Sequence, residues 1–78
     1  MIVKGAHVIV VLGRFKGSFA RVTLVGMRGN DTGAQFCEIE FQTLVDNLGD
    51  DDPGVLRAML TKRNAMVSCT RLRALTGT

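Results

Sequence analysis

Residues 4–22, KGAHVIVVLGRFKGSFARV, decide the fold because two apolar runs flank a loop bounded by glycines. Residues 8–12 are apolar and mostly β-branched, which favours a strand bent into a small curved sheet. Gly13 and Gly17 allow the positive φ angles of a sharp chain reversal. The stretch therefore predicts two adjacent strands that present residues 14–16 at the tip of the loop between them.

Further strands are predicted where apolar and polar residues alternate. The pattern marks residues 18–25 and 36–41. Residues 65–69 are interpreted as a fourth strand, and the spacing of Leu72 and Leu75 indicates a short last strand. A cluster of turn-forming residues separates the second and third strands, so these two are expected to form a hairpin. The chain is thus predicted to be mainly β.

One helix is predicted for residues 53–63. Asp52 is a suitable N-cap, Pro53 fits the first helical position and Asn64 suits a left-handed C-cap. Four apolar residues recur at helical spacing between these signals: Val55, Leu56, Met59 and Leu60. We expect this helix to close one end of the sheet and to enlarge the core, and the alternative is a helix that docks a partner.

Length and composition indicate one folded domain, residues 1–78. Hydrophobic residues make up 46% and charged residues 22% of the 78 residues, which matches ordinary globular proteins and excludes a multidomain enzyme. The longest unbroken apolar run is too short for a membrane span or a signal peptide. We therefore expect a cytoplasmic protein that does not act in a membrane.

The two cysteines, Cys37 and Cys69, match no metal-binding or redox spacing. Two interpretations stay open: both are small buried apolar residues, or they form one disulfide.

Charges are segregated along the chain. Residues 1–28 and 57–78 each hold five basic residues and no acid, whereas residues 29–56 hold seven acids and no base. Two interpretations follow: the basic termini share one face, or the opposite blocks pair across neighbouring strands.

Catalysis and cofactor binding are not predicted. The lone His7 has no recognisable catalytic or metal-binding partner in the sequence, and the glycine-bounded loop lacks the pattern of a nucleotide phosphate loop. Helix capping accounts for the acids at residues 50–52. We therefore predict no enzyme activity, no catalytic or metal-binding residues and no cofactor.

A family resemblance lies in the same opening stretch. Residues 4–22 fit the pattern KGxxVxVxxGxFKGxxAxV, which resembles the KOW motif of several ribosomal proteins and of NusG-class transcription elongation factors. The family usually has Gly where Ala20 stands. Residues 66–75 also look like the last strands of Src-homology-3-like barrels. Together with the predicted helix, the resemblance implies a small five-stranded Src-homology-3-like barrel with one inserted helix at about 53–63.

The resemblance implies that the loop contacts RNA or a protein partner. Basic side chains suit contacts to the phosphate backbone of RNA or DNA. The predicted binding residues are Arg14, Lys16 and Arg21, with help from Lys4, Arg71 and Arg73. The alternative function is a protein–protein interaction or assembly module that docks through its barrel or helix on a host complex or on a second copy of the chain.

Overall fold

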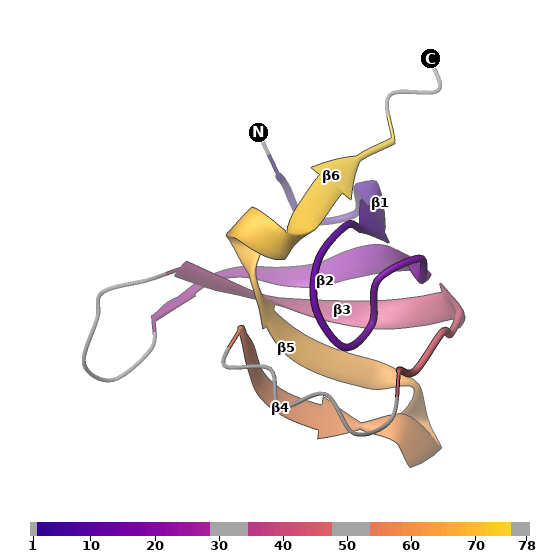
Figure 1. Cartoon of the computed structure of the whole chain (residues 1–78). Helices are drawn as coiled ribbons and strands as arrows, with labels where there is room; N and C mark the ends of the chain where they lie inside the picture. The colour runs from indigo at the N-terminus through magenta and orange to yellow at the C-terminus, as the bar shows by residue number, and fades with distance from the viewer. Residues whose placement is uncertain (1, 29–34, 48–53, 76–78) are drawn as a thin grey trace.

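The computed structural model describes residues 2–28, 35–47 and 54–75, which form one six-stranded antiparallel sheet. The strand order is β4-β5-β3-β2-β1-β6, so β4 and β6 lie at the edges (Figure 1). Two short 3₁₀ turns, η1 and η2, precede β5 and β6. The elements are β1 (His7–Val10), β2 (Phe19–Arg28), β3 (Gln35–Thr43), β4 (Val55–Met59), η1 (Leu60–Lys62), β5 (Asn64–Ser68), η2 (Cys69–Arg71) and β6 (Leu72–Ala74).

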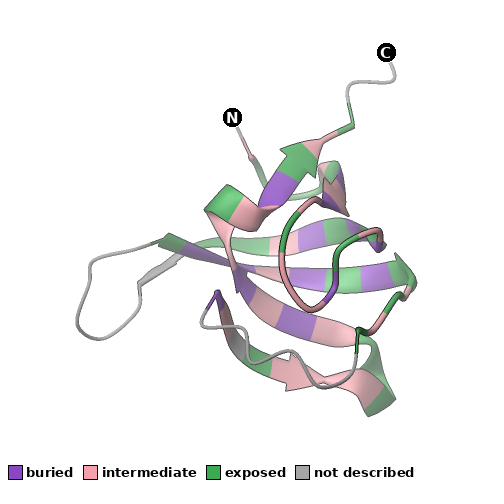
Figure 2. Cartoon of the chain, viewed as in Figure 1, coloured by how far each residue is buried: buried purple, intermediate pink, exposed green. Residues whose placement is uncertain are grey.

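The core lies on one face of the sheet, here called the inner face. In β1, Val8 and Val10 are buried, whereas His7 is exposed and Ile9 is half-buried. Successive side chains of a strand point to opposite faces, so this alternation defines an inner and an outer face (Figure 2). The buried cluster is Val8, Val10, Phe15, Ala20, Val22, Cys37, Ile39, Phe41, Ala65, Val67 and Leu72.

The predicted mainly β fold is confirmed. The strands expected at residues 8–12, 18–25, 36–41 and 65–69 correspond to β1, β2, β3 and β5, and the short last strand is β6. The predicted hairpin of the second and third strands is also present, because β2 pairs with β3. The turn cluster between them lies outside the described residues.

The predicted helix at residues 53–63 is wrong. Residues 55–59 form β4, which pairs with β5 so that Val55 lies opposite Val67 and Ala58 opposite Ala65. The 3₁₀ turn η1 joins the two strands. Arg63, the residue that follows η1, has a left-handed φ of 56°. The expected N-terminal cap, Asp52 and Pro53, lies outside the described residues.

The predicted five-stranded barrel is also wrong. Because β4 adds to β5, the sheet has six strands, and β4 and β6 are not paired with each other. The sheet is therefore open. The physical reason is that the residues expected to form a covering helix extend the sheet at one edge instead.

Phe15 does not lie exposed at the loop tip, contrary to the expectation for residues 14–16. Its side chain is only 1% exposed and packs on Phe41 of β3, with ring centroids 5.0 Å apart and planes tilted by 52°. Gly13 and Gly17 have φ angles of 85° and 93°, so the loop reverses at both ends and folds its aromatic side chain back into the core.

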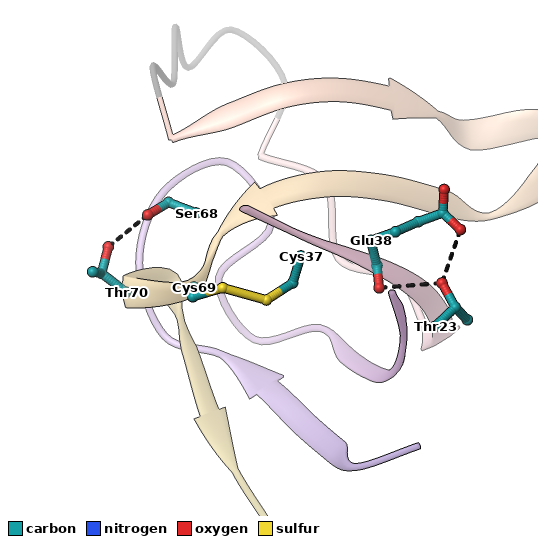
Figure 3. The surroundings of a disulfide bond; sticks show 6 residues. All are labelled: Thr23, Cys37, Glu38, Ser68, Cys69 and Thr70. Carbon is teal, nitrogen blue, oxygen red and sulfur yellow. Dashed lines mark hydrogen bonds between the residues drawn. A yellow bond between two sulfur atoms is a disulfide. The ribbon is translucent and has the colours of Figure 1, made fainter. Parts of the chain in front are cut away.

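A disulfide joins Cys37 of β3 to Cys69 of η2 (Figure 3). The two Cα atoms are 5.7 Å apart, inside the range usual for disulfides. The structure thereby decides between the two interpretations of the cysteines. The crosslink ties the turn that leads into edge strand β6 to a central strand of the sheet.

Candidate nucleic-acid interface

Arg14, the first predicted binding residue, is held in an ion pair. Its Nε lies 2.7 Å from Oδ1 of Asp46, and its Nη2 donates to Oδ2 at 3.0 Å. The guanidinium also lies 5.1 Å from the centroid of the Phe15 ring. Both planar donors face one carboxylate, which is the strongest arrangement for such a pair. The Arg14 side chain therefore fastens the loop to Asp46.

Further hydrogen bonds fasten the same loop to residues 45–47. The backbone and side-chain amides of Asn47 both donate to the carbonyl oxygen of Arg14, each at 2.9 Å. The buried Ser18 hydroxyl accepts from the Val45 backbone N–H and donates to the Val45 carbonyl. The loop is thus held at both ends by the segment that follows β3.

The ion pair lowers the pKa of Asp46, chiefly through the hydrogen bond from the Arg14 side chain. The charged carboxylate therefore stabilises the fold above its unfolded pKa of about 3.9, and the contribution is lost as pH falls through the lower folded value. We expect Asp46→Asn to be less stable than wild type near pH 7, with the difference shrinking below about pH 4. Urea unfolding followed by circular dichroism at several pH values measures it.

A matched control for this pH dependence is Glu40→Gln. Oε1 of Glu40 lies 3.9 Å from Nη2 of Arg21, and both side chains are about half exposed. This surface ion pair therefore contributes little to the free energy of unfolding. A stability deficit of Asp46→Asn that stays constant down to about pH 2 contradicts the role given to the Arg14 ion pair.

Arg71 is also engaged within the fold. A Cβ atom added to Gly54 would lie 2.5 Å from Nε and 2.7 Å from Cζ of Arg71, so the guanidinium packs directly on the Gly54 backbone. Arg71 is half-buried. Of the six predicted binding residues, Arg14 and Arg71 therefore both have structural roles.

Arg21 and Arg73 lie on the same outer face, that of β6, β1 and β2. The register places Arg73 opposite Ile9, and Ile9 opposite Phe19, in one row across the three strands. In the next row His7 lies opposite Arg21. These five residues, Arg73, Ile9, Phe19, His7 and Arg21, are called the basic face below.

The basic face contains no acid of its own, because no acidic residue occurs in β1, β2 or β6. Its border on the β3 side is Glu40, which lies opposite Arg21. The interpretation that opposite charge blocks pair is thus confirmed for Arg14 with Asp46 and, weakly, for Arg21 with Glu40. Arg21 and Arg73, from opposite ends of the chain, nevertheless share one face.

Lys4 and Lys16 lie at separate places. Lys4 is exposed in the turn before β1, where the Gly5 N–H donates to the carbonyl oxygen of Val22 in β2. Lys16 is exposed on the loop between β1 and β2. The structure thus divides the six predicted residues among the basic face, the loop, the turn before β1 and the Gly54 contact.

Sequence reasoning did not include Phe19 among the binding residues. Phe19 is 41% exposed, although it is a large aromatic residue in a central region of the sheet. The signal was present in the alternation: Ala20 and Val22 point inward, so Phe19 and Arg21 point outward together. Leu24 breaks this pattern and is exposed, because the β2–β3 register shifts between Val22 and Leu24.

Elsewhere in the described part of the chain, the structure gives no stronger indication of a ligand site than the basic face. A surface hollow of about 40 Å³ lies between β3, β4 and β5, far below the roughly 300–1,000 Å³ of small-molecule pockets. Among the described residues, no group of three or more potential metal ligands is present. The described segments also include no helix that is long and apolar enough to cross a membrane.

Comparison of the chain with family models, curated proteins and solved structures finds no match. The resemblance to KOW domains thus rests on the sequence of residues 4–22 and 66–75 and stays a prediction.

Proposed function

We propose that this protein binds the phosphate backbone of a nucleic acid through its basic face. The observation that carries the proposal is the joining of Arg21 and Arg73 with His7 on an outer face whose three strands contain no acid. Arginine donates in a planar fork that suits phosphate oxygens. The resemblance of residues 4–22 to the KOW motif implies contact with RNA or with a protein partner, and the first of these agrees with the proposal.

The structure changes which residues the proposal uses. Arg21 and Arg73 are exposed on the strands and are the central phosphate contacts, with Lys4 and Lys16 extending the charge beyond the basic face. Arg14 is assigned to loop structure instead, because its guanidinium is bound to Asp46. Arg71 supports the fold through its contact with Gly54.

Removing both arginines of the basic face is expected to weaken binding in a salt-dependent way. Each phosphate contact releases about 0.7 to 0.9 counterions, so Arg21→Gln with Arg73→Gln should flatten the slope of log affinity against log salt by roughly 1.4 to 1.8. Fluorescence anisotropy with labelled RNA and DNA, from about 50 to 200 mM salt, measures this slope. The loss should be similar for all sequences, since phosphate contacts carry no sequence information.

The matched control is Arg57→Gln with Lys62→Gln, which removes the same charge from exposed residues of β4 and η1. We expect this pair to change the slope much less. An equal effect of both pairs means that net charge, and not the basic face, governs binding. Wild-type protein that shows no salt-dependent binding near 50 mM salt disproves the proposal.

A second candidate is a protein-interaction or assembly module, favoured by the exposed apolar side chains. Leu12 is 54% exposed, and Val3, Leu24 and Leu75 are each more than 40% exposed. Apolar surface of this kind marks interfaces when it is contiguous. Light scattering distinguishes this candidate, since self-association predicts a mass that rises with protein concentration.

The expectation of a cytoplasmic protein stays a prediction, and the disulfide counts against it. Disulfides persist in oxidising compartments and are rare in the cytosol of most organisms.

A further inference from the structure

We propose that the nucleic acid is single-stranded and that one of its bases stacks on the Phe19 ring. This inference rests on the nucleic-acid binding proposed above and specifies its ligand. Phe19 is the exposed aromatic residue of the basic face, and its 41% exposure leaves ring surface open to a ligand.

The surroundings of Phe19 combine an apolar floor with flanking cations. Ile9 lies directly opposite Phe19 on β1 and is half-buried, so the two side chains form a low apolar step on the sheet. Arg73 lies on the far side of Ile9, and Arg21 is two residues further along β2 on the same face. A base over the ring would thus have its flanking phosphates beside arginines.

The position of the basic face on the strands of a sheet favours a single strand over a duplex. The basic face consists of side chains on three adjacent strands of one sheet, and none of its five residues lies on a helix or in a loop (Figure 1). Reading a duplex groove takes an inserted helix or two-stranded ribbon, and paired bases have no ring face available. A flexible single strand presents both its phosphates and its base faces, and aromatic side chains bind such bases without sequence preference.

Replacing the phenyl ring tests the stacking contact. We expect Phe19→Ala to weaken binding of an oligouridine or oligothymidine of about 12 nucleotides by roughly 5- to 150-fold, the range for one stacked base. Phe19→Leu keeps an apolar side chain without a ring face and should lose most of the same affinity. Leu12→Ala is the matched control, because Leu12 is exposed on the chain between β1 and the loop tip and should leave affinity unchanged.

A direct signal comes from Phe19→Trp. The chain has no Trp and no Tyr, so this variant carries one indole fluorophore. Stacking of a base should quench its emission and preserve the affinity, whereas Leu12→Trp should bind equally well without quenching. Circular dichroism of each variant checks that the fold is kept.

Wild-type protein titrated with an abasic strand separates this inference from the proposed function. The abasic strand keeps every phosphate and lacks bases, so we expect it to bind more weakly than oligothymidine with a similar salt slope. Equal affinity for both strands, together with unchanged binding by Phe19→Ala, overturns the stacking contact and leaves phosphate binding standing. Tighter binding of a duplex of the same length overturns the choice of a single strand. Absence of salt-dependent binding to any of them disproves the proposed function itself.

Discussion

Loss of the Cys37–Cys69 disulfide is expected to lower the free energy of unfolding by about 3 to 4 kcal/mol. The bridge joins residues 32 apart in sequence, and in the chain-entropy model its removal restores the freedom of that loop to the unfolded chain. A chain of 78 residues has a small core, so this change is a large share of a typical stability. Urea unfolding with and without a thiol reductant, followed by circular dichroism, measures it.

Two versions of this experiment separate the crosslink from packing. Reduction of wild type leaves both sulfur atoms in place. The double variant Cys37→Ala with Cys69→Ala also removes these atoms, including the sulfur of the fully buried Cys37. We expect the double variant to be somewhat less stable than reduced wild type and to be insensitive to the reductant. An unfolding midpoint of wild type that does not move on complete reduction contradicts the stabilising role of the bridge.

Reduction should also act on the basic face. Cys69 lies in η2, and the next element is β6, a strand of three residues that carries Arg73 at the edge of the sheet. The disulfide is the covalent link between this turn and central strand β3 (Figure 3). We therefore expect amide exchange in β6 to increase on reduction more than exchange in β3.

Replacing Phe15 by Ala is expected to cost about 3 to 5 kcal/mol, the range for removing a buried aromatic side chain. Phe15 is one of the largest fully buried residues, and its ring packs on Phe41 near the end of β3. The variant also removes the ring beneath the Arg14 guanidinium. Chemical unfolding of the variant and wild type, followed by circular dichroism, measures the difference.

The matched control is Lys16→Ala, the exposed neighbour of Phe15 in the same loop. Its effect should stay within about 0.5 kcal/mol, as for most surface substitutions. A Phe15→Ala variant that unfolds at nearly the same denaturant concentration as Lys16→Ala contradicts the inward position of the ring.

Alternation was a sufficient signal for the strands whose two sides differ in polarity. In β3, Cys37, Ile39 and Phe41 are buried and Glu40 is exposed, as a period of two requires, whereas the buried Phe36 departs from it. The same rule located β2, and the β-branched apolar run of residues 8–12 located β1, with bounds that differ by a few residues. It failed at Leu24, where a register shift in the β2–β3 pairing changes which side faces outward.

The spacing of apolar residues in 55–60 is compatible with both a helix and a strand, so the sequence signal was ambiguous there. The outcome depends on pairing with β5, where Val55 finds Val67 and Ala58 finds Ala65. Those partners lie after the η1 turn, and their hydrogen bonds complete β4 as an edge strand. Local propensity contains no information about such a partner.

The candidate site shows the same division. The basic character of both ends of the chain and the outward alternation of Phe19 and Arg21 follow from the sequence alone. The sequence did not indicate that Asp46 would bind Arg14, and it left open whether the two basic ends of the chain, with Arg21 and Arg73, would share one face. Both arrangements depend on how residues that are far apart in the sequence are placed in the fold.

By itself, the sequence determined a mainly β domain, most of its strands and the segregation of its charges, because these depend on residue type and local periodicity. Only the tertiary structure decided that residues 55–59 form strand β4, that the sheet is open, that the two cysteines are bonded and that Phe15 points inward. Each of these depends on which distant segments meet in the folded chain. Cys37 and Cys69, for example, become partners only when η2 is brought beside β3.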